Sequence, residues 1–361
     1  MMESNKSSLL NELTVVVPTY CRQKYILRQL NYWEKLPVKL IILDGSPKAL
    51  AIENLQNLRK NFHYIHSPTS IENRLVESLD YVSSEFVVLL SDDEFFLPSA
   101  LESCVLFLEE NIEYSCCKGQ AIGFDIKSHQ FLGRPVYPNL LNYSIESDNP
   151  TQRAHDHMLN YEIASLWSVQ RLIVYSACVK AVSHFFPYSS AGIVEMQFSL
   201  VTAFHGKVKV INELMWLRSF ENSNIWWSEG NVHLKKWWCE KSYSDEHQNF
   251  LSSIVFALSF VNLKSINVSD VKKAFLAYVG YCDDRVSILK VFNNLFNKLF
   301  KILLPNYLLL FLTKKLNLSG KQVLEFQSFD EVSKNIMTKG VKIDFRQLEI
   351  IKKCIVNFHE N

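Results

Sequence analysis

Residues 85–98 read EFVVLLSDDEFFLP, and this stretch decides how the rest of the chain is interpreted. After Glu85 the run to residue 90 is apolar, which predicts a short strand buried on both faces. Three carboxylates, Asp92, Asp93 and Glu94, follow it at once. Pro98 then predicts the first turn of a helix, because proline is favoured there. A buried strand, an acidic segment and a helix in this order are typical of an α/β sheet.

The same alternation of strand and helix precedes this stretch. Residues 13–17 and 38–43 are apolar runs and 62–66 is a shorter one, and each predicts a strand. Helical patterns separate them, with Ser70 as the N-cap of the last one; they cover 22–35, 49–60 and 70–81. Strands that alternate with helices predict a mainly parallel sheet.

Polar residues follow three of the predicted strands. They are Pro18-Thr19-Tyr20-Cys21-Arg22, Asp44-Gly45-Ser46 and Asp92-Asp93-Glu94. In open α/β sheets, ligands bind beyond the carboxyl ends of the strands. We therefore expect these three clusters to meet in one ligand site.

The later part of the chain has a weaker pattern. Between 113 and 225 we expect a polar loop near 125–153, a helical patch near 151–182 and a helix near 192–205. After residue 226 the chain becomes helical and rich in Leu, Phe, Asn and Lys. The predicted organisation is an α/β domain over 1–225 and a helical domain over 226–361.

Composition narrows the class of protein. The chain has 361 residues, of which 48% are hydrophobic, and a formal net charge of +1. A large core can be buried, and the near-neutral charge argues against a nucleic-acid binder.

The cysteines and the N-terminus indicate the compartment. The eight cysteines form no C-x-x-C pair, and none is spaced from other cysteines or histidines as zinc ligands are. Residues 1–11 lack a signal-peptide pattern, and no apolar run is long enough to span a bilayer, so we expect a cytoplasmic protein.

The acidic segment has the chemistry of a metal and diphosphate site. Hard cations prefer oxygen ligands, so adjacent carboxylates at a strand end suit Mg²⁺ or Mn²⁺. Strand alternation would point Asp92 and Glu94 the same way. The ion would neutralise a diphosphate leaving group. The alternative is a solvated acidic turn whose charges favour the dipole of the next helix.

The other two clusters would hold the rest of a nucleotide. Asp44 would accept a hydrogen bond from a base or a ribose hydroxyl, although an Asp-Gly turn is the plainer interpretation. Thr19 and Arg22 would hold the base or a phosphate, or else cap a loop. Asn73 and Arg74 begin a predicted helix, where donors can face a phosphate, or else lie on a surface helix face.

Four segments in order resemble family 2 glycosyltransferases of the GT-A fold. They are VVVPTYCR at 15–22, LDGS at 43–46, IENRL at 71–75 and VVLLSDDEFFLPSAL at 87–101. The resemblance extends over about residues 13–225, and similar proteins are a bacterial subgroup associated with surface polysaccharide loci. It implies a nucleotide-sugar donor, held by Pro18, Thr19, Arg22, Asp44, Ser46, Asn73, Arg74, Asp92, Asp93 and Arg218.

The resemblance also assigns metal and catalytic roles. Asp93 and Glu94 would bind the metal, although the family usually has Asp at the third acidic position, one methylene shorter. Glu195, in AGIVEMQF at 191–198, matches the position of the general base of an inverting transferase. Asp156 and Glu162 are weaker alternatives, and a helix-dipole role is the plainer interpretation of Glu195. Near Arg218 the sequence lacks the histidine that the family often has.

Three further features have competing interpretations. Five tryptophans would form a platform for an acceptor sugar, but core packing is favoured; they are Trp216, Trp226, Trp227, Trp237 and Trp238. His155-Asp156-His157 would suggest a metal pair, but a surface helix is favoured. Residues 289–316 are amphipathic with lysines on the polar side, which predicts a helix on anionic lipid. A helical cap or a dimer interface is the alternative.

The sequence therefore predicts metal-dependent, inverting transfer of a sugar to a saccharide or lipid-linked saccharide in bacterial surface polysaccharide synthesis. The protein would work in the cytoplasm, at the inner face of the membrane if 289–316 binds lipid. One alternative is a non-catalytic relative that binds a sugar or a partner. Another is a nucleotidyltransferase, which would have a glycine-rich loop where this chain has Pro-Thr-Tyr-Cys-Arg.

Overall fold

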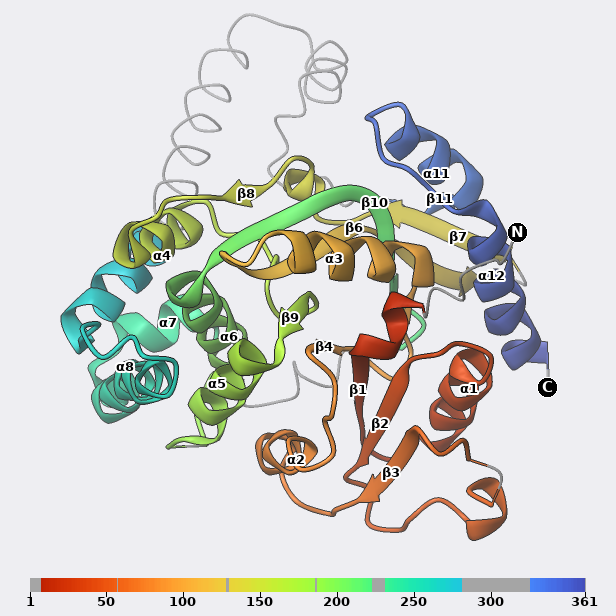
Figure 1. Cartoon of the computed structure of the whole chain (residues 1–361), viewed down its shortest axis with the longest axis horizontal. Helices are drawn as coiled ribbons and strands as arrows, with labels where there is room; N and C mark the ends of the chain where they lie inside the picture. The colour runs from red at the N-terminus through yellow and green to blue at the C-terminus, as the bar shows by residue number, and fades with distance from the viewer. Residues whose placement is uncertain are drawn as a thin grey trace, which may run out of the picture.

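The structure is a computed structural model that describes residues 8–56, 58–127, 130–185, 187–222, 231–280 and 325–360. Within these ranges eleven strands form one curled sheet with helices on both faces (Figure 1). Its first half is the predicted parallel core, in the order β4-β1-β2-β3. The bounds of these strands are Phe86–Leu89, Leu13–Thr19, Lys39–Asp44 and Phe62–His66. The parallel register sets Thr19 beside Asp44, so the two strand ends meet as expected.

The second half of the sheet contains strands that the sequence analysis missed. β6 (Tyr114–Lys127) and β10 (Lys207–Ser219) run parallel to each other through the region expected to be irregular. The short strand β9 (Val169–Arg171) joins β6 to β4 by antiparallel pairing on both sides. Four more strands pair with β6, β7 or β10; they are β5 (Phe95–Phe96), β7 (Gln130–Pro135), β8 (Ser144–Ile145) and β11 (Gln327–Ser328). The loop predicted near 125–153 was therefore wrong, since it contains β7 and β8.

Most of the predicted helices are present. α1 (Gln23–Trp33), α2 (Ile71–Ser78) and α3 (Pro98–Glu110) follow β1, β3 and β5, and Ser70 caps α2 through the backbone N–H of Asn73. The helix predicted over 49–60 is wrong, because a 3₁₀ turn at Ile52–Asn54 is the only helical segment among the described residues of this range. Residues 51–54 are exposed, so no apolar face is available to stabilise a longer helix.

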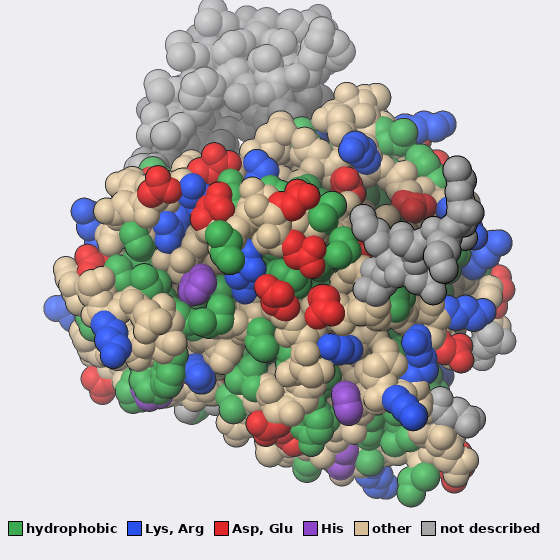
Figure 2. Space-filling view, viewed as in Figure 1, with side chains coloured by type: hydrophobic (Ala, Val, Ile, Leu, Met, Phe, Trp, Pro, Cys, Tyr) green, Lys and Arg blue, Asp and Glu red, His purple; other side chains and the backbone are tan. Residues whose placement is uncertain are grey.

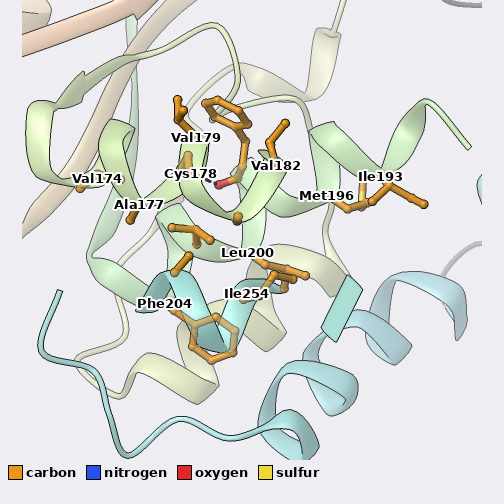
Figure 3. Close-up of a cluster of buried hydrophobic side chains, with 14 of the residues drawn as sticks. Val174, Ala177, Cys178, Val179, Val182, Ile193, Met196, Leu200, Phe204 and Ile254 are labelled. Atoms are coloured by element: carbon orange, nitrogen blue, oxygen red, sulfur yellow. Dashed lines mark hydrogen bonds between the residues drawn. The ribbon is translucent and has the colours of Figure 1, made fainter. Parts of the chain in front are cut away.

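Alternating side chains of the parallel strands divide the core into two layers. Val15 and Val17 face one layer together with α1 and α3, whereas Val16 faces the other. The second layer is formed by α2, α5 (Leu172–Ser183), α6 (Gly192–His205) and α8 (Ser244–Ser259). Figure 3 shows its centre, where Cys178 of α5, Leu200 of α6 and Ile254 lie together. A side chain of this size buried completely contributes roughly 1.5–3 kcal/mol.

The helices after residue 226 pack in two separate places. α7 (Leu234–Cys239) and α8 extend the α5–α6 layer, to which α4 (Pro150–Leu159) also belongs. α11 (Phe329–Met337) and α12 (Phe345–Glu360), at the blue end of the chain in Figure 1, cover the β6–β7–β10 side and approach α1. The boundary at 225/226 stays a prediction, and residues 289–316 lie outside the described residues. None of the described helices combines the length and apolar character needed to cross a bilayer.

The face on which α3 lies is acidic. Figure 2 shows acidic side chains gathered in the middle of this view, and α3 itself ends in the exposed residues Glu109 and Glu110. A negative potential disfavours an anionic ligand there. The polar strand ends are therefore the place to look for a phosphate site.

Candidate functional site

The carboxyl ends of β1 and β4 are joined by a direct hydrogen bond. The Thr19 hydroxyl donates to Asp92 Oδ2 at 2.6 Å, and both side chains are buried. Burial raises the pKa of Asp92 to about 6, although the cation of Arg22 opposes this shift. The structure therefore brings the first and third clusters together as the parallel sheet predicted, and the Asp44 cluster joins them through the Gly45 N–H, which donates to the Thr19 carbonyl at 3.0 Å.

Arg22 is held between the two aspartates. Its Nη1 lies 2.8 Å from Asp92 Oδ1 and its Nη2 lies 2.6 Å from Asp93 Oδ2. The chain reaches this position through Cys21, which has a positive φ of 54°, directly after β1. Asn222 adds a donor to the same Asp93 oxygen at 3.0 Å. Asp92 and Asp93 thus present oxygens to one positively charged group.

Glu94 does not share this direction, so the expected alignment with Asp92 was wrong. β4 ends at Leu89, and residues 91–94 form a turn closed by the Glu94 N–H to the Ser91 carbonyl, so strand alternation does not apply. One carboxylate oxygen of Glu94 accepts the indole N–H of Trp216 at 2.8 Å. Burial, with a further contribution from Asp93, raises the pKa of Glu94 to about 8. In the absence of another cation, Glu94 is therefore mainly protonated near neutral pH.

A buried lysine that the sequence analysis did not single out lies behind Trp216. Lys118 comes from the middle of β6; its Nζ lies 4.3 Å from the Trp216 ring and donates to the carbonyl of Ile163 at 2.9 Å. Burial lowers the pKa of Lys118 to about 7, while Glu94 and Glu195 raise it. No local pattern marks this lysine, because β6 also contains the buried polar residues Ser115 and Gln120.

Glu195 lies in the first turn of α6 and is half-buried. The hydroxyl of Tyr161 donates to its carboxylate. Burial raises the pKa of Glu195, and the Tyr161 hydrogen bond, Lys118 and Arg218 lower it. Arg218, near the end of β10, donates to the Tyr137 hydroxyl. Lys118 and Arg218 therefore act electrostatically on both Glu94 and Glu195.

The two alternative bases lie in other surroundings. Asp156 accepts the side-chain amide of Gln152 one turn earlier on α4, at 2.7 Å. Glu162 accepts the amide of the exposed Asn139 at 2.5 Å. All three acids are half-buried, so Glu195 is distinguished by its partner Tyr161 rather than by its exposed fraction.

The Asp44 cluster is tied together by bonds within the protein. The Asp44 carboxylate is fully buried and accepts the N–H and hydroxyl of Ser46, at 2.9 and 2.5 Å, and the hydroxyl of Tyr64 at 2.6 Å. Arg74 donates to the carbonyls of Thr19 and Leu43, at 2.8 and 2.6 Å. Its guanidinium lies so close to Gly45 that a Cβ there would be 2.5 Å from it.

This cluster places three more of the predicted residues. Pro18 pairs with Leu43 inside the sheet, so it lies beside the Asp44 turn. Ser46 holds the start of the Arg22 loop, because its hydroxyl accepts the N–H of Cys21 at 2.8 Å. Asn73 is exposed on α2. A nucleotide role for each of them stays a prediction.

Two other predictions concern metal ligands and tryptophans. Among the described residues, no three His, Cys, Asp or Glu side chains are grouped so that they would hold a metal ion. His157 is a core residue whose Nδ1 lies 2.5 Å from the Tyr143 hydroxyl. Trp216 and Trp237 are buried, as core packing requires, and Trp238 packs on Phe275 with ring centroids 4.7 Å apart. Trp226 and Trp227 lie outside the described residues.

Comparisons with known proteins agree with this architecture. Residues 14–175 match the family model described as Glycosyl transferase family 2. The crystal structure of residues 1–349 of S. aureus TarS in complex with UDP-GlcNAc is similar at a TM-score of 0.51 and 14% sequence identity, covering 75% of this chain and 72% of that one. The structure of TarS 1–349 without that ligand gives a TM-score of 0.49 and 13% identity, covering 75% and 71%. No curated protein matches the chain. The similarity at 14% identity concerns the fold, and it confirms the predicted α/β class.

Proposed function

Residues 14–175 belong to glycosyl transferase family 2 and the chain has the GT-A fold, and from this premise we propose that the protein transfers a sugar from a nucleotide-sugar donor to an acceptor hydroxyl. The observation that carries the proposal is the joined polar edge of β1 and β4. There Thr19, Arg22, Asp92 and Asp93 are in direct contact. The half-buried acid Glu195 is electrostatically coupled to the neighbouring cations Lys118 and Arg218.

The donor would be a nucleoside diphosphate sugar. TarS was crystallised with UDP-GlcNAc, which makes this class of donor the first to test. The base and ribose would lie toward Asp44 and Thr19, and the diphosphate toward Arg22 and Arg218. Guanidinium groups suit this role because they remain charged and donate two parallel hydrogen bonds to phosphate oxygens.

A divalent ion, Mn²⁺ or Mg²⁺, would be held by Asp93 and Glu94, with Asp92 beside them, once Glu94 turns from Trp216 toward Asp93. Two observations fit such an ion. Asp92 and Asp93 already direct oxygens at a single cation, the Arg22 guanidinium. Repulsion from Asp93 helps to keep Glu94 protonated, and a dication would offset that repulsion. When bound, the ion would neutralise charge on the departing diphosphate.

Glu195 would act as the general base that takes the proton of the attacking acceptor hydroxyl, which gives inversion at the sugar carbon. A base works best when its pKa lies near the working pH, and burial moves the pKa of Glu195 upward. Tyr161 orients the carboxylate through its hydrogen bond. Arg22 and Arg218 stabilise the negative charge of the leaving group, which is the larger contribution in many enzymes.

The acceptor and the location are part of the same proposal. A saccharide or lipid-linked saccharide in bacterial surface polysaccharide synthesis agrees with the family resemblance. In that setting the protein would work in the cytoplasm, and residues 289–316 would contact the membrane or a second copy of the chain.

Release of nucleotide from UDP-, GDP-, CMP- and dTDP-sugars, with and without Mn²⁺, tests the proposal. We expect turnover of one donor class, loss of that turnover in Glu195→Gln and retained nucleotide affinity in the variant. If no donor turns over, and Asp93→Ala binds nucleotides as the wild type does, the protein is a non-catalytic relative.

A further inference from the structure

A buried ion pair lies directly behind the acidic turn. Arg28 of α1 and Glu221, just after β10, have side chains that are only 1% and 2% exposed. They meet through two contacts, Nη1 to Oε1 at 3.1 Å and Nη2 to Oε2 at 3.0 Å. Removing two charges from water is costly, so such a pair persists only when further groups satisfy it.

The pair is connected to Asp93 on both sides. Nη2 of Arg28 also donates to the backbone carbonyl of Asp93 at 2.9 Å. Asn222, the residue after Glu221, donates to the Asp93 carboxylate at 3.0 Å. The position of Asp93, main chain and side chain, is therefore set by Arg28 and the 221–222 segment.

The last turn of α12 supplies further partners of this pair, beside Ser219, whose hydroxyl donates to Glu221 Oε2 at 3.1 Å. Nε2 of His359 donates to Glu221 Oε1, and the ring of Phe358 lies 4.5 Å from the Arg28 guanidinium. Phe358 also packs on Tyr25, with ring centroids 4.9 Å apart, and Tyr25 covers another part of the same guanidinium. The pair thus receives one hydrogen bond and one aromatic face from the C-terminal helix.

We propose that the end of α12 is a positioning element of the donor site, in which His359 and Phe358 hold the Arg28–Glu221 pair and thereby fix Asp93. The catalytic consequence rests on the proposed function, but the mechanical link does not. Without His359, Glu221 loses a donor in a buried setting. Without Phe358, water reaches the guanidinium and weakens the pair, because screening rises with solvent exposure.

α12 has other anchors, so changes at its end can be made without undocking it. Leu348, Ile351 and Ile355 are buried in the cluster under β6 and β10. The side chain of Gln347 accepts the N–H and hydroxyl of Ser99, at 3.0 and 2.9 Å. These contacts lie one to three turns before His359, and they should keep α12 in place in the variants.

The test compares His359→Ala, Phe358→Ala and His359→Gln with the matched control Lys353→Ala, an exposed residue of the same helix. Hydrogen exchange is measured on peptides that cover 91–97 and 219–222. We expect faster exchange in both peptides for the two alanine variants at positions 358 and 359, and wild-type exchange for the control. His359→Gln keeps a side-chain N–H donor and should recover much of the protection.

Kinetics on the same proteins then separate this inference from the proposed function. Misplacement of a substrate-positioning group by 1 Å can lower the rate about a hundredfold. We expect a smaller displacement of Asp93 in His359→Ala, and therefore a fall in kcat/KM for the donor of about tenfold. If the wild type turns over no donor but exchange changes as expected, the proposed function fails and the positioning role stands. If exchange in 91–97 is the same in His359→Ala, Phe358→Ala and Lys353→Ala, the positioning role is wrong, whatever the activity.

Discussion

Acid should destabilise the fold through His157, which lies in α4 beneath the Glu195 region. The imidazole is fully buried and touches the Tyr143 hydroxyl, and its Nε2 is a buried atom without a hydrogen-bond partner. Its ring also packs against Tyr161, the donor to Glu195, with centroids 5.7 Å apart. Burial lowers the pKa of His157 from 6.5 to about 4. Protonation would therefore place an unpaired charge in the core.

The pKa values give the sign and size of the effect. Below pH 6.5 the unfolded chain binds a proton at this position, whereas the folded chain does so only near pH 4. Stability from the neutral imidazole is therefore fully present above pH 6.5 and is lost as the pH falls toward 4. At about 1.4 kcal/mol per pH unit over a shift of roughly 2.5 units, the loss is about 3 kcal/mol.

Urea unfolding at several pH values between 7.5 and 4 checks this magnitude. The free energy of unfolding of the wild type should fall more steeply than that of His157→Gln, and the gap between the two should change by about 3 kcal/mol over this range. His155→Gln is the matched control, because His155 is on the same helix with its side chain 33% exposed. His205, whose pKa is also lowered to about 4, contributes equally to all three proteins. Equal slopes for the wild type and His157→Gln would refute the reasoning.

The remaining predictions concern the site. Glu195→Gln should lower kcat by about 10²–10⁴-fold, and calorimetry should show unchanged nucleotide affinity; retained turnover would exclude it as the base. Arg22→Ala should weaken nucleoside diphosphate binding by at least about tenfold, since a charged hydrogen bond is lost, and unchanged calorimetric affinity would contradict its phosphate role. Lys118→Met should raise the pKa of Glu195, because Lys118 lowers it, and should move the acidic limb of the kcat profile to higher pH. Glu94→Gln should weaken activation by Mn²⁺ at least about tenfold; an unaltered Mn²⁺ titration would remove it from the metal site.

The first half of the fold could be predicted because its signals are local. The strands at 13–19 and 86–89 are continuous apolar runs, and Ser70 and Pro98 mark helix starts in the way that backbone chemistry favours. Parallel pairing then places Thr19 and Asp92 at one edge without further information. The contact between these two side chains was therefore within reach of the sequence.

The second half of the fold could not be predicted from local patterns, because buried polar residues in its strands form hydrogen bonds with residues far away in the chain. Within β6, Gln120 donates to the carbonyl of Leu140 at 3.2 Å and Lys118 to that of Ile163. A strand with buried polar side chains lacks the apolar run that would reveal it. β10 is different, because its alternation at Lys207-Val208-Lys209-Val210 is typical of a strand. This signal was overlooked in the sequence analysis.

The direction of Glu94 shows why a motif does not determine a site. The three carboxylates are adjacent in sequence, but the turn after Leu89 sends Asp92 and Asp93 to Arg22 and Glu94 to Trp216. Trp216 reaches Glu94 because β10 pairs with β5, the two-residue strand that begins at Phe95. Burial raises the pKa of Glu94 and the indole N–H of Trp216 lowers it, so a strand distant in the chain acts on this carboxylate. The acidic segment predicts where carboxylates gather, whereas the sheet and the turn decide which partner each of them meets.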